Sequence, residues 1–218
     1  MPDPILPDIA HNFLNVPDLD YGAYREGKRA ALACMLVSRE MAALTRPCLY
    51  HFAWLRGPQE AKMLAYALTF DAAKQERVDQ MARYVHHIRL EGIHGPIDIM
   101  DVKDIVERTH QLWTYADQHA LRRPQHGEWN PEASPTALMS ILARPERELR
   151  HLHWSTYDEL QFDYDMLPAL RIGGAFSNLE YLDVSTWSGA YGDGGCSDLF
   201  IPPGGINTSV SLLSLIHI

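Results

Sequence analysis

The chain has 218 residues, of which 46% are hydrophobic and 22% charged, a composition typical of a globular protein. Its formal net charge of -9, without a Lys/Arg cluster, argues against nucleic-acid and membrane-surface binding, since both need a basic patch. The opening segment, MPDPILPDIA, does not resemble a signal peptide, and no apolar run is long enough to span a bilayer. Three cysteines without a CxxC pattern favour a reducing compartment, so we expect an intracellular protein, cytoplasmic or nuclear.

Residues 21–44 follow a helical pattern that carries two apolar stripes side by side. The first stripe consists of Leu32, Met35, Leu36 and Ala43, and the second of Val37, Met41 and Leu44. A surface helix needs only one stripe, so two predict a helix covered both by its own domain and by a partner. The alternative is an ordinary core helix. Pro47 is expected to end the helix, and an extended segment is expected at 49–55.

Further along the chain, alternation and helical spacing predict a strand and three helices. The strand is expected at 85–92, and the helices at 59–70, 100–117 and 136–145. Asp101 is the predicted cap of the second of these helices, and Ser134-Pro135 the predicted start of the third.

Two later segments share a frame of residues at an offset of 30. LRHLHWST begins at Leu149 and LEYLDVST at Leu179, and both read L-x-x-L-x-φ-S-T, where φ is apolar. The apolar part of the frame also fits at Val85 and at Val210, whereas the unit expected near residue 117 falls in a region that reads as helix. A near-constant period predicts stacked units that bury one continuous core between them.

This pattern resembles a leucine-rich repeat, in which each unit has a short strand and a return segment that is often helical. The resemblance implies an α/β fold in which a short N-terminal helical module precedes an irregular solenoid of strand-plus-helix units.

Residues 31–68 resemble the F-box proteins of the large fungal expansion. Leu36-Val37-Ser38-Arg39 stands where that family has LVSR, Leu49-Tyr50 where it has an extended LLY stretch, and Pro58-Gln59-Glu60-Ala61 where a helix opens with P-x-x-A. MARYVHHIRLEG, at 81–92, resembles the segment that comes next in such proteins, and Leu6-Pro7-Asp8-Ile9 stands at the family's opening motif.

The family resemblance implies an F-box-like module at 1–55 and a leucine-rich-repeat-like region at 56–218. In the family, the module binds the Skp1 adaptor of a cullin-type ubiquitin ligase, and the repeats hold a protein substrate. The positions expected to contact Skp1 are Leu6, Pro7, Ile9, Leu36, Val37 and Met41. The chain itself would then be a non-catalytic adaptor without a cofactor. The sequence does not name the substrate.

The repeat frame places its variable positions in two rows on the outward face of the strands. The first row is expected to hold His87, His151 and Tyr181, and the second Arg89, His153 and Asp183. We interpret these residues as candidates for the substrate-binding face. The spacing of His151 and His153 also permits metal chelation, but the surrounding residues do not form the two close pairs of a structural zinc site, so no metal is expected.

Two alternatives to the adaptor remain. One is a stand-alone repeat module that binds protein without any ligase, its N-terminal helices serving as a cap. The other is a small metal-dependent enzyme that uses the histidine-rich face. No G-x-S-x-G motif is present, and no catalytic residue is predicted.

The closing residues LSLIHI, Leu213–Ile218, resemble a translated sequencing adapter. We therefore expect an assembly scar there and a repeat region that is incomplete at its C-terminus.

Overall fold

The computed structural model describes residues 21–73, 79–121, 134–156, 168–169, 171–186 and 196–200. The chain divides into two compact units, Met1–Phe52 and Ala53–Ile218. The predicted boundary after residue 55 falls at the end of a strand, β1 (Phe52–Leu55). Each unit is described by itself below.

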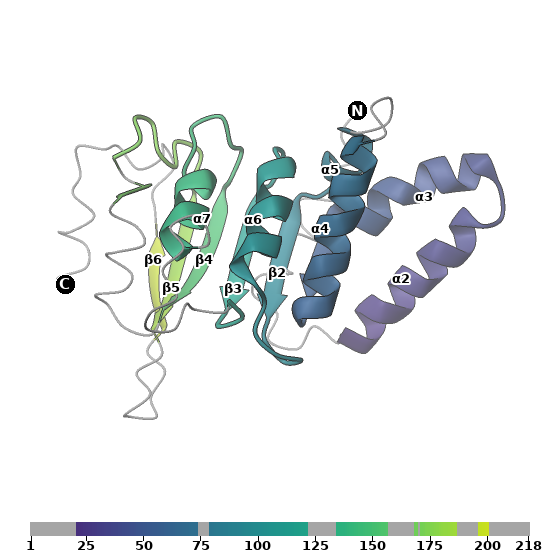
Figure 1. Cartoon of the computed structure of the whole chain (residues 1–218), viewed down its shortest axis with the longest axis horizontal. Helices are drawn as coiled ribbons and strands as arrows, with labels where there is room; N and C mark the ends of the chain where they lie inside the picture. Colours follow the sequence, from purple (N-terminus) through teal and green to yellow (C-terminus); the bar gives the residue numbers. More distant parts are fainter. Residues whose placement is uncertain are drawn as a thin grey trace. The chain divides into compact units, whose positions relative to one another are not determined.

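The first unit contains a helical hairpin made of α2 (Tyr21–Met35) and α3 (Arg39–His51) (Figure 1). The single helix expected at 21–44 is wrong, because Ser38 begins a new helix. The side chain of Ser38 accepts a hydrogen bond from the backbone N–H of Met41 at 3.1 Å, which satisfies a free donor of the first turn. Pro47 lies inside α3 and does not end it, so the predicted extended segment is reduced to β1.

The second unit is built on a sheet whose strands lie in chain order, from β1 to β6. Strands β2 to β5 are parallel, and β6 runs antiparallel to β5. The strands after β1 are β2 (His87–Glu91), β3 (Thr114–Gln118), β4 (His151–Thr156), β5 (Tyr181–Thr186) and β6 (Cys196–Phe200). The chain therefore has mixed helices and a parallel sheet, preceded by N-terminal helices, as the expected α/β class requires.

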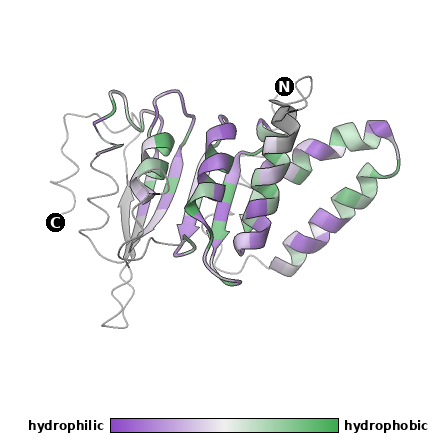
Figure 2. Cartoon of the chain, in the orientation of Figure 1, coloured by the Kyte–Doolittle hydropathy of each residue, from purple (hydrophilic) through white to green (hydrophobic). Residues whose placement is uncertain are grey.

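Helices connect the first strands of this sheet and lie on one of its faces (Figure 1). They are α4 (Pro58–Ala73), α5 (Asp79–Ala82), α6 (Ile99–Arg108) and α7 (Pro135–Leu142). Helix α6 contacts both α4 and α7. Figure 2 shows hydrophobic and hydrophilic residues together on α6 and on α7, as expected for helices with one buried face.

The helix predicted at 100–117 is wrong toward its C-terminal end, where β3 forms. Helix α6 begins earlier than expected, because Asp98 is its cap in place of Asp101 and accepts from the N–H of Met100 at 2.8 Å. It ends where the hydroxyl of Thr109 donates to the carbonyl of Ile105 at 3.0 Å. Residues 114–118 instead pair with β2, which satisfies their backbone groups. By contrast, the predicted start of α7 is confirmed, with Ser134 as its cap and Pro135 in the first turn.

The apolar frame of the repeat is buried, and β3 is the repeat strand that was expected near residue 117 but read as helix. The central position of the frame is occupied by Ile88, Tyr115, Leu152 and Leu182, which are neighbours across four parallel strands. Each of these four side chains is at most 1% exposed. The first frame position is buried as well, at Val85, Leu112, Leu149 and Leu179.

A repeated backbone contact precedes strands β3, β4 and β5. The carbonyl of His86 accepts from the N–H groups of Trp113 and Thr114, at 2.8 and 3.1 Å. The carbonyls of Trp113 and Arg150 each accept in the same way from the two residues that precede or begin the next strand. Successive strand repeats of the second unit are thus joined by one recurring backbone contact. The further unit expected at Val210 lies outside the described residues.

Candidate functional site

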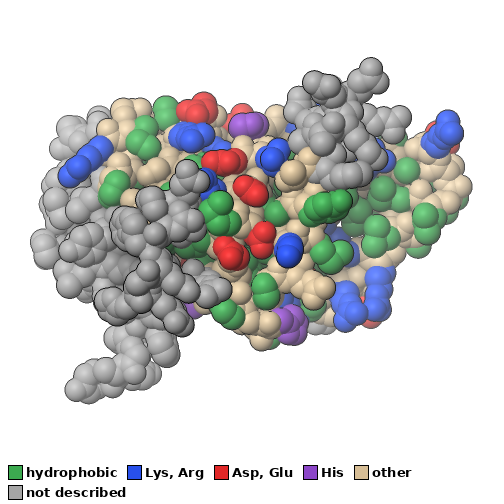
Figure 3. Space-filling view, viewed as in Figure 1, with side chains coloured by type: hydrophobic (Ala, Val, Ile, Leu, Met, Phe, Trp, Pro, Cys, Tyr) green, Lys and Arg blue, Asp and Glu red, His purple; other side chains and the backbone are tan. Residues whose placement is uncertain are grey.

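The turn of the α2–α3 hairpin presents apolar side chains to solvent. Leu36 is 88% exposed, Val37 is 75% exposed, and Met41, in the first turn of α3, is 37% exposed. Leu32 and Leu44 are also exposed. We call these five residues the hairpin patch, and Figure 3 shows hydrophobic side chains gathered over this part of the molecule. The alternative of an ordinary core helix is wrong for Leu36 and Val37. The other predicted contacts, Leu6, Pro7 and Ile9, lie outside the described residues.

The open end of the hairpin is held by polar and aromatic contacts. The hydroxyl of Tyr24 donates to the carbonyl of Phe52 at 3.2 Å, and the two rings meet edge to face at 5.5 Å. The ammonium of Lys28 donates to the carbonyl of Leu49, in the last turn of α3. Burial lowers the pKa of Lys28 to about 8. Among the described residues of α2 and α3, Leu49 alone is buried, so the hairpin has few apolar side chains in a core of its own.

The sheet face opposite the buried frame carries the two predicted rows, in register. His87, Thr114, His151 and Tyr181 are cross-strand neighbours, and so are Arg89, Ala116, His153 and Asp183. Sequence reasoning placed all six candidates correctly in these rows but missed Thr114 and Ala116, because it read β3 as helix. We call the two rows the open face.

Exposure separates the candidates on the open face. His87 is only 4% exposed and meets the ring of Trp113 edge to face at 5.9 Å. In this conformation His87 is too buried to touch a partner directly, which corrects the expectation for this residue. His151 and Tyr181 are half-buried, with their rings 6.0 Å apart, and they keep accessible surface.

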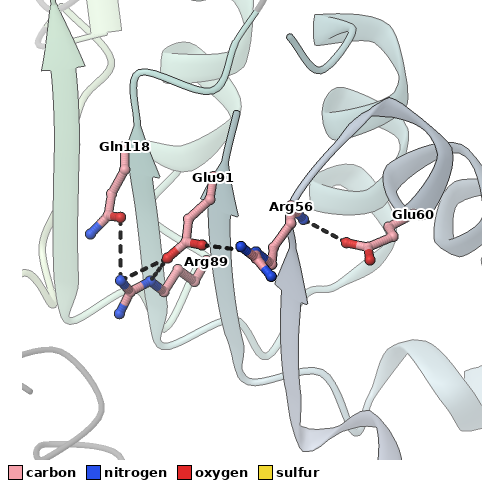
Figure 4. A network of polar contacts seen from close by, with 5 residues as sticks. All are labelled: Arg56, Glu60, Arg89, Glu91 and Gln118. Atoms are coloured by element: carbon pink, nitrogen blue, oxygen red, sulfur yellow. Dashed lines mark hydrogen bonds and ion pairs between the residues drawn. The ribbon is translucent and has the colours of Figure 1, made fainter. Parts of the chain in front are cut away.

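Arg89 belongs to a polar network that joins the first three strands (Figure 4). Its guanidinium pairs with the carboxylate of Glu91 at 2.8 Å and donates to the side-chain oxygen of Gln118 at 3.2 Å. It also stacks over the ring of Trp54 at 4.7 Å. Arg56 reaches the same carboxylate at 3.5 Å, and Glu60 accepts from the backbone N–H of Arg56 at 2.6 Å. Two arginines and two glutamates balance, so the network is a structural clamp and offers no net charge to a ligand.

His153 and Asp183 form a close pair between neighbouring strands. Nδ1 of His153 lies 2.5 Å from Oδ2 of Asp183, and Nε2 lies 3.5 Å from the hydroxyl of Ser155. This order of residues resembles a hydrolytic triad. However, Ser155 is fully buried and donates its hydroxyl hydrogen to the carbonyl of Asp117 at 2.5 Å. The serine is therefore not presented as a nucleophile.

A third row of side chains, which the sequence analysis missed, lies just before the strands. The ring centroids of His86 and Trp113 lie 4.3 Å apart, and the guanidinium of Arg150 lies 5.8 Å from the centroid of the Trp113 ring. Arg150 and Glu180 are exposed and 3.8 Å apart. Aligning Leu112 with Val85 and Leu149 would have revealed this row. An exposed arginine beside a tryptophan is a composition enriched in protein-contact surfaces.

Two kinds of site receive no support from the described residues. Within them, no group of three His, Cys, Asp or Glu side chains is placed to hold a metal ion. No helix in the described part of the chain combines the length and apolar character needed to cross a bilayer.

Comparison with known proteins does not assign a family. No family model matches the chain, and neither the curated proteins nor the solved structures contain a significant match.

Proposed function

We propose that the chain is a substrate-recognition adaptor of a Skp1-cullin-type ubiquitin ligase. In this proposal the hairpin patch binds a Skp1-like adaptor and the open face binds a protein substrate. The chain would carry out no chemistry, because ubiquitin transfer belongs to other subunits. Such a protein works in the cytoplasm, the nucleus or both.

The exposure of Leu36 and Val37 is the observation that carries this proposal. Both lie in the LVSR segment that resembles the F-box family, and both expose most of their side chain. Exposed large apolar side chains that lie close together mark a protein-contact surface. Burying one such side chain against a partner contributes about 1.5–3 kcal/mol, enough to decide whether a complex forms.

The finer proposal for the second unit is a leucine-rich-repeat-like solenoid. Parallel strands in chain order, helices on one face, and a buried frame at equivalent positions support it. The central frame positions follow one another at residues 88, 115, 152 and 182, so the repeats differ in length, and the near-constant period of the sequence pattern does not extend to β3. The outward positions with accessible surface for a substrate lie on β4 and β5, at His151, His153, Tyr181 and Asp183.

Co-purification with Skp1 tests the proposal. Full-length wild type is expected to retain Skp1, and Val37→Asp is expected to reduce binding at least about tenfold, since a charge would be buried against the partner. Ile93→Asp is the matched control, because Ile93 is 60% exposed and lies in the second unit. Equal retention by the two variants, with unchanged circular dichroism, would reject the assignment of the hairpin patch.

The alternative is a repeat module that binds protein without any ligase. Absence of Skp1 binding by a folded wild-type sample would favour this alternative.

A further inference from the structure

Helix α4 exposes two large apolar side chains in addition to those it buries. Its buried side is formed by Ala61, Ala65 and Leu68. Met63 is 67% exposed and Tyr66 is 66% exposed. These two residues lie three positions apart, so they occupy neighbouring turns of one side of the helix. Helix α4 therefore buries one apolar side within the second unit and presents another apolar surface to solvent.

Carboxylates of α6 lie beside this apolar surface. The charge of Lys62, which precedes Met63, acts on Asp101 in the first turn of α6, so this part of α4 faces the start of α6. Asp98 caps α6, and Asp104 lies about one turn after Asp101. Burial and the negative charges of Asp98 and Asp104 raise the pKa of Asp101, while Lys62 opposes the rise. Three carboxylates thus face one lysine, and negative charge is in excess.

The remaining charged residues of α6 leave this excess in place. Lys103 lies two positions after Asp101 and therefore about 200° round the helix, and Glu107 follows Lys103 after one turn. Arg108 lies at the far end of α6. Helices α4 and α6 lie side by side (Figure 1). Figure 3 shows acidic side chains gathered over α6 and hydrophobic side chains over α4. An apolar pair and a row of carboxylates thus form one outer surface.

We infer that this surface, formed by Met63, Tyr66, Asp98, Asp101 and Asp104, docks a basic amphipathic helix of a partner protein. We call these five residues the α4–α6 face. The apolar side chains of the partner helix pack on the pair of α4, and its Lys or Arg side chains approach the carboxylates of α6. This interaction goes beyond the proposed adaptor function, because neither the hairpin patch nor the open face contributes to it.

The spacing of the α4–α6 face explains why a helix fits. Met63 and Tyr66 are one turn apart, and a partner helix presents its own side chains at the same interval. Helices pack by placing such rows of side chains into the grooves between the rows of another helix. Apolar anchors flanked by complementary charges are the pattern by which amphipathic helices are recognised.

The distribution of the carboxylates favours several separate positive charges over one cation. Among the described residues, no three His, Cys, Asp or Glu side chains are placed to hold a metal ion. Carboxylates that extend from the cap into the second turn of α6 instead match Lys or Arg side chains spread along a partner helix.

Fluorescence anisotropy with the full chain and a labelled model peptide tests this inference. The peptide has about 15 residues of Leu and Lys at helical spacing, long enough to form a helix on binding. We expect wild type to bind it at least about tenfold more tightly than the same peptide with Glu in place of Lys. Tyr66→Ser, and the pair Asp101→Asn with Asp104→Asn, should each weaken binding at least about fivefold.

Matched controls separate the α4–α6 face from general attraction to an acidic chain. Glu26→Gln with Glu146→Gln removes the same charge at exposed positions elsewhere, and Ile93→Ser removes another exposed apolar side chain. Each control should change the affinity less than about twofold.

Three results would overturn the inference. They are equal weakening by the controls, wild-type affinity in the variants of the α4–α6 face, and equal binding of the Leu-Glu peptide. Circular dichroism verifies that each variant is folded, and the Asp101 and Asp104 pair decides the test if Tyr66→Ser folds poorly. Skp1 takes no part in the assay, so its outcome is distinguishable from that of the proposed function.

Discussion

The two units of this chain treat their apolar residues in opposite ways. In the sheet unit, the frame residues Ile88, Leu152 and Leu182 are at most 1% exposed. In the hairpin, residues of the same kind, Leu36 and Val37, are at least 75% exposed. A high content of leucine and valine therefore does not by itself indicate a core. Apolar side chains that are buried stabilise the fold, whereas apolar side chains that stay exposed are available to a partner.

The largest expected effect is on the buried frame. Trp154→Ala removes a side chain that is fully buried beside Tyr115, so it is expected to destabilise the sheet unit by about 3–5 kcal/mol through the cavity it leaves. Urea unfolding followed by circular dichroism measures this change. A loss below about 1 kcal/mol, the size typical of ordinary substitutions, would contradict the view that this unit is held by its frame.

A smaller effect on stability is expected at Arg147, which links the segment before β4 to the end of α6. The buried guanidinium of Arg147 donates to the carbonyls of Thr109 and Glu107 at 2.8 and 3.4 Å, just beyond the end of α6 and in its last turn. Arg147→Ala should cost about 1.5–3 kcal/mol, because two carbonyls at the end of a helix lose a charged donor. The matched control is Arg144→Ala, since Arg144 is exposed. Similar unfolding midpoints for both variants would argue against this link.

The hairpin should respond to pH through Lys28. Its pKa is lowered from 10.5 to about 8 by burial, so the unfolded chain binds more protons between these values. The free energy of unfolding should therefore rise as pH increases from about 8 to 10.5. When pH is lowered again from 10.5, this contribution of Lys28 should decrease, and it should be lost once pH has fallen through 8. We expect a change of about 1 kcal/mol, less than the full linkage value, because the side chain is only half-buried.

Helical circular dichroism during urea unfolding at several pH values measures the response of Lys28. Lys28→Met should abolish the rise, and Arg29→Met, at an exposed neighbouring position, should preserve it. If Lys28→Met keeps the wild-type slope, the lysine is not the source of the pH dependence.

The smallest effect on stability is expected in the hairpin patch. Leu36→Ser removes an apolar side chain that solvent already surrounds, so stability should change by less than about 0.5 kcal/mol. The same substitution should clearly weaken any complex that buries the patch. Thermal unfolding and a binding assay on one sample separate the two effects. A large loss of stability would show that Leu36 belongs to a core, and the contrast between the units would fail.

Strand β3 illustrates why part of the fold was not predictable from the sequence. Leu112-x-x-Tyr115-x-Asp117 occupies the frame of the repeat, but its third position is an aspartate in place of an apolar residue. In the structure Asp117 is fully buried, and its carboxylate accepts from the backbone N–H of Ala120 at 2.8 Å. This bond compensates the polar group at an apolar position. This bond forms only in the folded turn, so the sequence alone gives no sign that an aspartate can occupy the position. The helical spacing of the nearby apolar residues therefore led to the prediction of a helix.

The hairpin shows a similar limit at its turn and at Pro47. Spacing within 21–44 is compatible with one long helix, and only the capping bond between Ser38 and Met41 reveals the break. Pro47 is expected to end a helix because it lacks an N–H, yet α3 continues to His51. In α3 the contacts of Lys28 with Leu49 and of Tyr24 with Phe52 hold the chain beyond the proline.

The sequence by itself determined the frame on β2, β4 and β5 and the six candidate positions of the open face on these strands, but not those on β3. Alternation along a strand and the offset between strands are local properties, so His151, His153, Tyr181 and Asp183 could be placed side by side without a structure. Only the tertiary structure decided which residues are accessible. Burial depends on what other elements lie against a side chain, and this is why His87 is enclosed by its neighbours while Leu36 and Val37 are exposed.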